Sequence, residues 1–484
     1  MKLKAPGATA ATARSPINWF PGIFLAAFLT IISASSAVGK TGARGLNPAE
    51  EWVVAQATAG KIADLDGALN ADHTKKFPEE KDRKLSAQFL EDLLTGTLPG
   101  VKMHRHGVRI IGAIIDESID LRNAQIPWEV WLDHCQFNKN ATFGSASSTR
   151  VVSFDGSTFN AEATFDRMKV GDIFFRRAVF EGPVNFASAD IAGQFVASGA
   201  QFQNKEQGAT FNSMKVRGHA FFSNAVFEGS VNFVSADIAG NFAAQEAKFQ
   251  NKEKEASFNG MKVGGHAFFR NAVFEGPANF SLADFTSNFD ATGAKFQNKE
   301  KGANFNSMKV GGHAFFIKAV FEGPVDFVRA DVTSNFEADE AKFQDKEKGA
   351  SFGSMKVGQN ALFKKAVFEG PVDFGYADLA RLDLSSSVLP KVAAQFRMQG
   401  MIYKYIRAVP KNEPESHKAL LKLADQSAYT ADVYSNLEEF FYARAIAPMQ
   451  TKLSLQENVG SEKNTFAALL APPLALLLVT GFGG

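Results

Sequence analysis

Residues 178–182 read Ala-Val-Phe-Glu-Gly, and the same five residues recur four more times along the chain. The Phe of this string is residue 180, 227, 274, 321 or 368, so each copy follows the last after 47 residues. The string Met-Lys-Val keeps the same step, beginning at residues 214, 261, 308 and 355, and an earlier copy begins at 168. A repeat of this length indicates a solenoid, in which each unit buries its apolar face by stacking on its neighbours.

A shorter period runs inside the 47-residue unit. Apolar residues stand about five positions apart, as Phe165, Val170 and Phe175 do, and a small residue such as Ala163 often lies two positions earlier. An amphipathic helix would place apolar residues three or four apart, and an ordinary strand would place them two apart. The spacing therefore indicates a chain that turns a corner about every five residues.

This pattern of a small residue, any residue, Phe or Leu and two further residues resembles the pentapeptide-repeat family, in its Phe-rich variant. The resemblance implies a mainly β fold, a right-handed quadrilateral β-helix with four pentapeptides in each coil and Phe or Leu stacked inside. We expect this solenoid to occupy residues 107–390, with short helical caps at both ends. Two features depart from the family pattern: six-residue steps such as Phe180 to Phe186, and a nine-residue gap between Phe202 and Phe211.

A charged insert fills that nine-residue gap in four successive units, at residues 203–209, 250–256, 297–303 and 344–350. We expect each 47-residue unit to comprise two coils of about 20 residues and one insert of about seven. Since neighbouring strands lie about 4.8 Å apart, the inserts should project from one face at intervals of about 10 Å.

The segments that flank the repeats have helical patterns. Residues 39–106 are expected to form the N-terminal cap, with one helix that begins at Asn47 and ends near Gly60 and a second helix from Ser86 to Leu94. Residues 391–450 are expected to form a helical C-terminal cap, because residues 418–424 and 431–444 have helical periodicity. Such caps cover solenoid edges that would otherwise favour aggregation.

Both ends of the chain carry apolar stretches. Residues 1–38 are expected to be either a signal peptide cleaved after Ala37 or an N-terminal anchor, because basic residues precede a short apolar stretch at 23–32. Either interpretation predicts an exported protein that is periplasmic, secreted or membrane-associated. Residues 451–484 include an apolar tail that either associates with a membrane or forms a buried or disordered end, since Pro472 and its neighbour interrupt any helix there.

The composition argues against several classes of function. The 52 basic and 51 acidic residues give a net charge of +1, which provides neither the positive field of a nonspecific nucleic-acid binder nor the acidic surface of a DNA mimic. The 47 Phe residues far outnumber the 4 Trp and 6 Tyr, and a ring without a polar group serves to fill a core. The single cysteine, Cys135, is expected to be a buried small apolar residue.

Three histidines, His219, His266 and His313, also lie 47 residues apart and should form a column on the solenoid. Asp172 and Asn360 continue that column in the neighbouring units. Ligands of one metal ion lie about 2 Å from it, whereas residues one unit apart should be about 10 Å apart. We therefore expect hydrogen bonds at a corner of the coil and no metal site.

Three further columns contain charged residues. They are Glu181, Glu228, Glu275, Glu322 and Glu369; Asp190, Asp237, Asp284, Asp331 and Asp378; and Lys169, Lys215, Lys262, Lys309 and Lys356. An active site needs one asymmetric constellation, whereas a column presents the same group five times. We therefore expect no catalytic or cofactor-binding residues, and we interpret the Lys column as a solvated face, not a binding stripe, whose lysines could pair with an acidic column across the surface. The unrepeated residues 105–108 (Arg-His-Gly-Val) should form a structural seam between cap and solenoid.

These expectations favour a non-enzymatic structural or interaction scaffold, without a cofactor and without a nucleic-acid ligand. Its repetitive rigid surface would face an unknown protein or envelope component, and self-association into a homo-oligomer stays open. The alternative is a membrane-tethered accessory or channel-related protein, because both ends are apolar. Inhibition of a topoisomerase by DNA mimicry is known among the proteins that this chain resembles, but the neutral charge opposes it here.

Mass spectrometry of the N-terminus, combined with separation of soluble and membrane fractions, tests the interpretation of residues 1–38. A cleaved signal peptide predicts a soluble product that begins at Val38. An uncut chain that stays in the membrane fraction after alkaline washing would contradict cleavage and favour the anchor.

Overall fold

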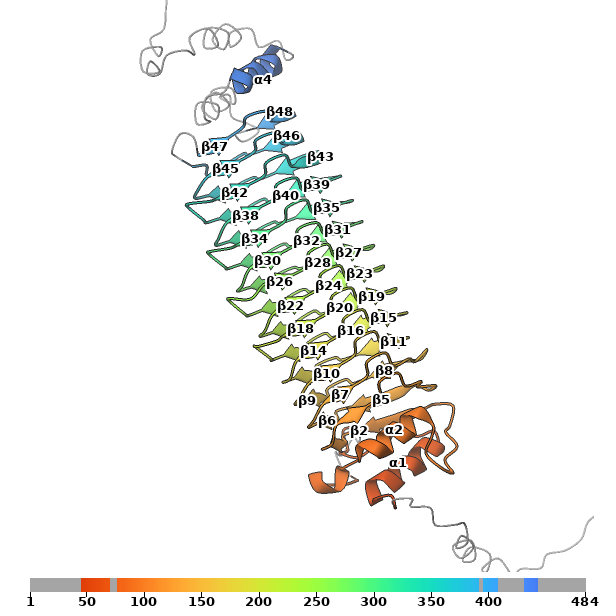
Figure 1. The fold of residues 1–484 in the computed structure, drawn as a ribbon. Coiled ribbons are helices and arrows are strands. Elements are labelled where there is room, and N and C mark those ends of the chain that lie inside the picture. The colour runs from red at the N-terminus through yellow and green to blue at the C-terminus, as the bar shows by residue number, and fades with distance from the viewer. Residues whose placement is uncertain (1–44, 70–75, 391–394, 408–430, 443–484) are drawn as a thin grey trace, which may run out of the picture. The chain divides into compact units, whose positions relative to one another are not determined.

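The structure, a computed structural model, describes residues 45–69, 76–390, 395–407 and 431–442. It is a parallel β-solenoid whose strands form sheets of 23, 13 and 12 members, stacked coil upon coil (Figure 1). The mainly β class predicted from the sequence is thus confirmed. No described helix is both long enough and apolar enough to cross a membrane.

Each coil has four strand positions, so four rows of strands run along the solenoid, and we number them face 1 to face 4 in chain order. Face 1 contains β11 (Lys169–Val170), β15 (Asp190–Ile191), β19 (Lys215–Val216), β23 (Asp237–Ile238), β27 (Lys262–Val263), β31 (Asp284–Phe285), β35 (Lys309–Val310) and β39 (Asp331–Val332). Face 2 contains β1 (Ala63–Asp64), β2 (Val108–Ile111), β5 (Val130–Asp133), β8 (Val152–Ser153), β12 (Ile173–Phe174), β16 (Phe195–Val196), β20 (Ala220–Phe221), β24 (Phe242–Ala243), β28 (Ala267–Phe268), β32 (Phe289–Asp290), β36 (Ala314–Phe315) and β40 (Phe336–Glu337). The longer strands β43 (Lys356–Leu362), β46 (Asp378–Asp383) and β48 (Ile402–Arg407) belong to both faces.

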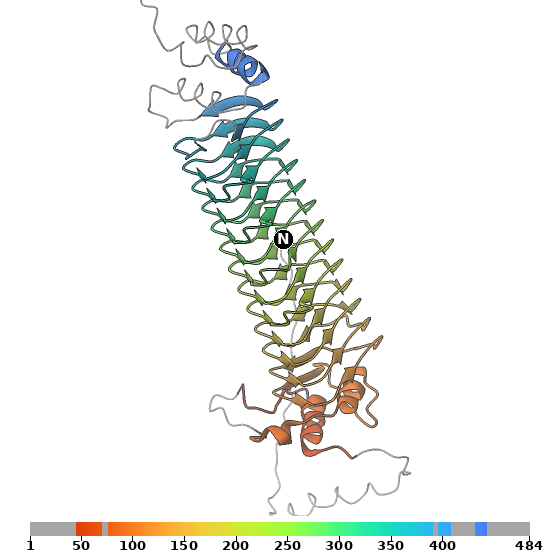
Figure 2. The same ribbon diagram turned by 60° about the vertical axis from the view of Figure 1, so that its left-hand side comes forward.

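The other two faces are separate sheets (Figure 2). Face 3 contains β3 (Ile114–Ile115), β6 (Gln136–Phe137), β9 (Thr158–Phe159), β13 (Val179–Phe180), β17 (Gln201–Phe202), β21 (Val226–Phe227), β25 (Lys248–Phe249), β29 (Val273–Phe274), β33 (Lys295–Phe296), β37 (Val320–Phe321), β41 (Lys342–Phe343) and β44 (Val367–Phe368). Face 4 contains β4 (Ile119–Asp120), β7 (Ala141–Thr142), β10 (Ala163–Thr164), β14 (Val184–Asn185), β18 (Ala209–Thr210), β22 (Val231–Asn232), β26 (Ala256–Ser257), β30 (Ala278–Asn279), β34 (Ala303–Asn304), β38 (Val325–Asp326), β42 (Ala350–Ser351), β45 (Val372–Asp373) and β47 (Phe396–Arg397).

Columns of stacked Phe rings fill the interior. On face 3, neighbouring rings from Phe137 to Phe368 have centroids 4.5–5.2 Å apart and are inclined by only 1–8°. A second column on face 4 is similarly stacked, and rings of face 2 meet it edge-on, as Phe222 meets Phe233 at 5.1 Å and 85°. Stacked and edge-on pairs are the favourable arrangements of aromatic rings, beyond the benefit of burial itself.

The 47-residue unit contains two coils, as expected, but the expected lengths of its parts are wrong. Lys215 pairs with Asp237 after 22 residues, and Asp237 pairs with Lys262 after 25 residues. The base coil therefore has 22 residues instead of 20, and the insert adds three residues to every second coil instead of seven.

The extra residues of the base coil lie at two of its corners. Asn224 (φ 59°) and Ser235 (φ 56°) have left-handed backbone conformations. They lie just after a strand of face 2 and a strand of face 4, respectively, where the next strand begins six residues after the start of the last. Each donates its N–H to a carbonyl of the following coil, Gln245 and Asn259 respectively, over 2.9 Å. These hydrogen bonds offset the energetic cost of the left-handed backbone conformation, which is unfavourable for residues other than glycine. Even Leu282 adopts it, with φ 59°, at such a corner.

The N-terminal segment contains the two expected helices, α1 (Pro48–Thr58) and α2 (Ala87–Thr95), at the end of the solenoid (Figure 1). Glu50 joins them: it accepts hydrogen bonds from the Asn47 N–H at 2.9 Å and from the Ser86 N–H and hydroxyl at 3.0 and 2.6 Å. The segment also holds a short 3₁₀ helix, η1 (Glu80–Arg83), and strand β1, which pairs with β2. The solenoid thus begins before residue 107, within the segment that was expected to be helical.

The solenoid also continues past residue 390. Strand β47 pairs with β45 and β48 pairs with β46, so residues 396–407 belong to the solenoid and not to a helical cap. Helix α4 (Ala431–Tyr442) follows, and the amide of its Asn436 donates to the Met401 carbonyl at 3.2 Å. The helix expected at 418–424 lies outside the described residues.

The stacked interior predicts that substitutions at Phe274 and His266, which lie one strand apart, lower the free energy of unfolding by very different amounts. Phe274→Ala should lower the free energy of unfolding by about 3–5 kcal/mol, because Phe274 is fully buried and its removal opens a cavity between two stacked rings. His266→Ala should lower it by only about 1 kcal/mol, the worth of one hydrogen bond. Urea unfolding followed by circular dichroism measures both, and equal losses would contradict the inward and outward assignments.

Candidate functional site

The inserts lie at the corner between faces 3 and 4. In the second insert, the Asn251 side-chain oxygen accepts the N–H groups of Glu253 at 3.1 Å and Lys254 at 2.8 Å, which fixes a tight turn. The residues at the same position in the other inserts, Asn204, Asn298 and Asp345, accept N–H groups in the same way. Each insert is therefore a defined turn on a rigid solenoid.

Successive inserts are hydrogen-bonded to one another. The Lys254 ammonium donates to the Lys205 carbonyl of the preceding insert at 3.3 Å, and the Asn298 amide donates to the Lys252 carbonyl at 3.1 Å. The Lys348 ammonium likewise donates to a carbonyl of the third insert, at 3.3 Å. The four inserts thus form one continuous feature, which we call the insert ridge (residues 203–209, 250–256, 297–303 and 344–350).

The Glu column of the sequence pattern lies beside the insert ridge. Lys–Glu pairs join the two, with nitrogen–oxygen distances of 3.4 Å for Lys205–Glu228, 3.9 Å for Lys299–Glu322 and 3.7 Å for Lys346–Glu369. These pairs are exposed, so each stabilises the fold by less than about 1 kcal/mol. An open cleft between the second and third inserts is lined by Lys252, Glu275 and Lys299.

The Lys and Asp columns form a single row on face 1. Lys169 pairs in register with Asp190, Asp190 with Lys215, and the alternation continues to Asp378. Each Lys from Lys215 to Lys356 therefore lies between two Asp residues about 4.8 Å away along the row, whereas Lys169 lies between Ser147 and Asp190. The strand register thus alternates Lys and Asp along one row, and Asp190 of this row forms an ion pair with Arg217 at 3.1 Å.

The His column lies at the edge of face 2 and forms the expected hydrogen bonds with the neighbouring coils. His219 Nδ1 accepts the Asn241 N–H at 2.9 Å, and Asn241 Oδ1 accepts the His266 N–H at 2.9 Å. His266 Nδ1 in turn accepts the Asn288 N–H at 3.4 Å, and Asn288 Oδ1 accepts the His313 N–H at 2.9 Å. Among the described residues, no group of three His, Cys, Asp or Glu side chains is placed to hold a metal ion.

Sequence reasoning overlooked the outer Phe of the Phe-Phe pairs. Ala220 and Phe222 point inward and are buried, whereas Phe221 between them points outward and is partly exposed. Phe174, Phe268 and Phe315 occupy the same position in other units. Since neighbouring residues of a strand point to opposite faces, the Phe-Phe dipeptide was the signal that could have revealed these outward rings.

Residues 105–108 form the expected seam. His106 Nδ1 lies 3.1 Å from the Gly60 carbonyl at the end of α1, and the Arg109 guanidinium donates to the same carbonyl at 2.6 Å. Gly107 has φ +73°, and a Cβ there would lie 2.1 Å from the Glu129 carbonyl oxygen, so a side chain would not fit. These contacts join the first helix to the solenoid.

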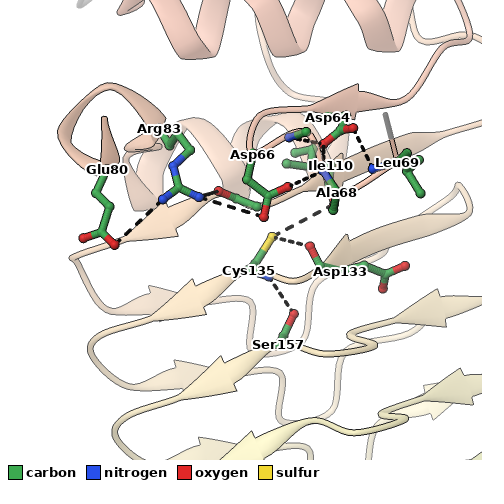
Figure 3. Close-up of polar contacts among 12 residues, drawn as sticks. Asp64, Asp66, Ala68, Leu69, Glu80, Arg83, Ile110, Asp133, Cys135 and Ser157 are labelled. Atoms are coloured by element: carbon green, nitrogen blue, oxygen red, sulfur yellow. Dashed lines mark hydrogen bonds and ion pairs between the residues drawn. The ribbon is translucent and has the colours of Figure 1, made fainter. Parts of the chain in front are cut away.

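Cys135 is buried inside the first coils, as expected, between Ile110, Asp133 and Ser157 (Figure 3). Its sulfur lies 3.3 Å from the Asp133 carbonyl, and its N–H donates to the Ser157 hydroxyl at 2.9 Å. Burial raises the pKa of the Cys135 thiol far above its usual range. Burial also raises the pKa of the Asp133 carboxyl, which accepts a 2.6 Å hydrogen bond from Ser153.

Because the Cys135 thiol is buried, we expect it to react slowly with thiol reagents in the native protein. The thiolate is the reactive form, so native protein at pH 8 should react with a thiol reagent such as dithionitrobenzoate at least about 100-fold more slowly than protein unfolded in guanidinium. Absorbance of the released thiolate measures the two rates. Rapid labelling of the native protein would show that the first coils open readily.

Comparison with known proteins yields no match to this chain among family models, curated proteins or solved structures.

Proposed function

We propose that this protein is a non-enzymatic interaction scaffold, built from Phe-rich pentapeptide repeats, that presents a rigid repetitive surface to a protein or envelope component outside the cytosol. The observation that carries the proposal is the insert ridge, where the same Lys, Glu and Asn or Asp groups return at every second coil. A partner with several equivalent contacts would gain affinity from each further insert that it reaches.

The rigidity of the surface supports a binding role. The insert turns are closed by their own Asn or Asp side chains and rest on coils whose Phe rings are stacked throughout. A preordered surface loses little conformational entropy when it binds, so more of the contact energy appears as affinity.

The arrangement of titratable groups agrees with this proposal. The carboxylates and lysines occur in columns, and burial raises the pKa of the Asp133 carboxyl in the same part of the first coils as the buried Cys135. A catalytic constellation combines different groups that orient one another at a single place. The repeated columns provide many equivalent contacts instead.

The assignment to pentapeptide repeats rests on the four strands of each coil and the inward Phe columns. Steps of five and six residues alternate in the base coil, and each insert coil has one step of eight, which departs from a strict five-residue period. The alternative, a membrane-tethered accessory or channel-related protein, rests on the apolar stretches at 23–32 and 466–479, which lie outside the described residues.

Shortening the inserts tests the proposal. Deletion of residues 252–254, with equivalent deletions of 205–207, 299–301 and 346–348, reduces each insert step to the five residues of the neighbouring coils. Immobilised full-length protein should capture a partner from envelope extracts, and the shortened variant should recover at least about tenfold less, because the contacts of the insert ridge are gone. Quantitative mass spectrometry measures the recovery.

Two control variants sharpen this experiment. Lys262→Ser with Lys309→Ser removes exposed charges from face 1 and should leave recovery unchanged. Replacement of residues 252–254 by three serines keeps the length of the insert and separates its charge from its shape. Unchanged recovery by the shortened variant would overturn the insert ridge as the binding surface.

A further inference from the structure

Face 1 carries one row of alternating charges along the solenoid. The Lys and Asp columns, which the sequence presents separately, interleave in the strand register. All of these side chains point outward, and all except that of Asp190 are fully exposed. We call them the charge row, which comprises Lys169, Asp190, Lys215, Asp237, Lys262, Asp284, Lys309, Asp331, Lys356 and Asp378.

The charge row has almost no partner within its own chain. Asp190 pairs with the Arg217 guanidinium at 3.1 Å. Among the described residues, none of the other nine side chains of the row forms an ion pair or a side-chain hydrogen bond. By contrast, the Glu column on the other side of the coil is paired with lysines of the insert ridge. The charges of face 1 are therefore available to a partner.

The surface beside the charge row is flat. Two residues after each member of the row, on the same outward side, the chain has mostly small side chains. These are Gly171, Ala192, Ala239, Gly264, Thr286, Gly311, Thr333, Gly358 and Ala380, with Arg217 as the one long side chain. Thr333, Gly358 and Ala380 line an open groove next to Asp331 and Lys356. Another flat surface can thus approach the charge row closely.

The charge row is complementary to a second copy of itself that runs in the opposite direction. It has ten members, begins with Lys and ends with Asp, so reversal places every Lys opposite an Asp. Lys169 then faces Asp378 of the second copy, and Lys262 faces Asp284. A two-fold axis across the row relates the two copies, which is the usual symmetry of homodimers. A two-fold axis parallel to the solenoid would instead place Lys against Lys.

We propose that face 1 binds a second copy of this chain, so that two solenoids form an antiparallel dimer with their charge rows facing each other. This surface is separate from the insert ridge, and the inference does not depend on the partner proposed there. It differs from the solvated face expected from the sequence, because the strand register joins two columns that the sequence presents separately.

The size of face 1 sets the strength of the dimer. The charge row is about 43 Å long and the face about 10 Å wide, so the two copies together would bury about 900 Å². Interfaces of this size belong to weak, reversible complexes. We therefore expect a dissociation constant in the micromolar range.

The alternation of charge also selects the partner and its register. A shift of the second copy by one coil would oppose like charges along the whole row, and a shift by two coils would leave two members of each row unpaired. A polymer of uniform charge, such as a nucleic acid, would meet a like charge at every second coil. Charge complementarity therefore favours a second copy.

Sedimentation equilibrium of the full-length protein tests the proposal. A dimer should form in about 50 mM NaCl, and its dissociation constant should rise at least about tenfold in about 500 mM NaCl, because salt screens exposed ion pairs. A protein that is monomeric at about 100 µM in the low-salt buffer would overturn the proposal, since the interface is expected to have micromolar affinity. Association that is unaffected by salt would overturn it as well.

Charge reversal locates the interface. Lys262→Glu with Lys309→Glu should weaken self-association at least about tenfold, because the new carboxylates would face Asp284 and Asp237 of the second copy. Asp237→Lys with Asp284→Lys should weaken it equally. An equimolar mixture of the two variants should associate again, because the introduced carboxylates then face the introduced ammonium groups. A mixture that stays monomeric would contradict the antiparallel arrangement.

A matched control reverses the same charges elsewhere. Lys248 and Lys295 are exposed residues of face 3 that also lie 47 residues apart. Lys248→Glu with Lys295→Glu should leave the dissociation constant of the dimer unchanged. Weakening as large as that caused by the face 1 reversal would show a general effect of net charge and would contradict an interface on face 1.

Carbodiimide coupling, which joins a Lys directly to an Asp, determines the direction of the second copy. The dimer fraction should contain the linked pairs Lys169–Asp378 and Lys215–Asp331, identified by mass spectrometry of the digested protein. Within one chain these pairs are about 43 and 24 Å apart, so only two copies can form them. A dimer fraction without these pairs would contradict the antiparallel arrangement.

The insert-shortened variant separates the two proposals. Its charge row lies on face 1, whereas the inserts lie at the corner between faces 3 and 4. It should therefore dimerise normally while losing the captured partner, and the variant Lys262→Glu with Lys309→Glu should capture the partner without dimerising. Loss of dimerisation in the insert-shortened variant, with its fold intact by circular dichroism, would contradict a dimer through face 1.

Discussion

The parallel stacking of each coil on the next is the constraint on which the rest of this structure depends. Backbone hydrogen bonds fix the distance between coils, so an inward side chain must pack against its counterparts one coil above and one coil below. A flat ring suits this geometry, since rings such as Phe249, Phe274 and Phe296 can stack in parallel at 4.5–4.9 Å without leaving a gap. The predominance of Phe in the sequence is thus a consequence of the coil spacing.

The interior could be predicted because it repeats. The five-residue spacing of Phe165, Val170 and Phe175 indicated corners and inward rings, and the helix signals at Asn47 and Ser86 marked α1 and α2. The coil lengths could not be predicted, because they depend on left-handed corner residues such as Ser235 and Leu282, and the corner sequence does not require glycine. Strands β1 and β48 were overlooked because their apolar patterns are short and carry no repeat.

The candidate surfaces were predictable to different degrees. The positions of the inserts followed from the gap between Phe202 and Phe211, but the hydrogen bonds that join them appeared only in the structure. The His column was recognised from the 47-residue step, whereas the outward Phe beside each His was hidden among inward rings of the same type. A residue type that fills the core can also occupy the surface, and composition alone does not separate the two roles.

The alternating row of Lys and Asp on face 1 limits which coils can pair with one another and how the number of coils can change. Five nearly identical units create many wrong pairings that differ little in energy, a hazard for any repetitive chain. A slip of one coil would bring Lys beside Lys and Asp beside Asp, and would also set Phe242 of one coil where Ala220 belongs. A slip of two coils restores every match. Within the repeats, the pair of coils is therefore the smallest piece whose duplication or loss keeps both the Lys–Asp alternation and the Phe–Ala alternation, which corresponds to a step of 47 residues.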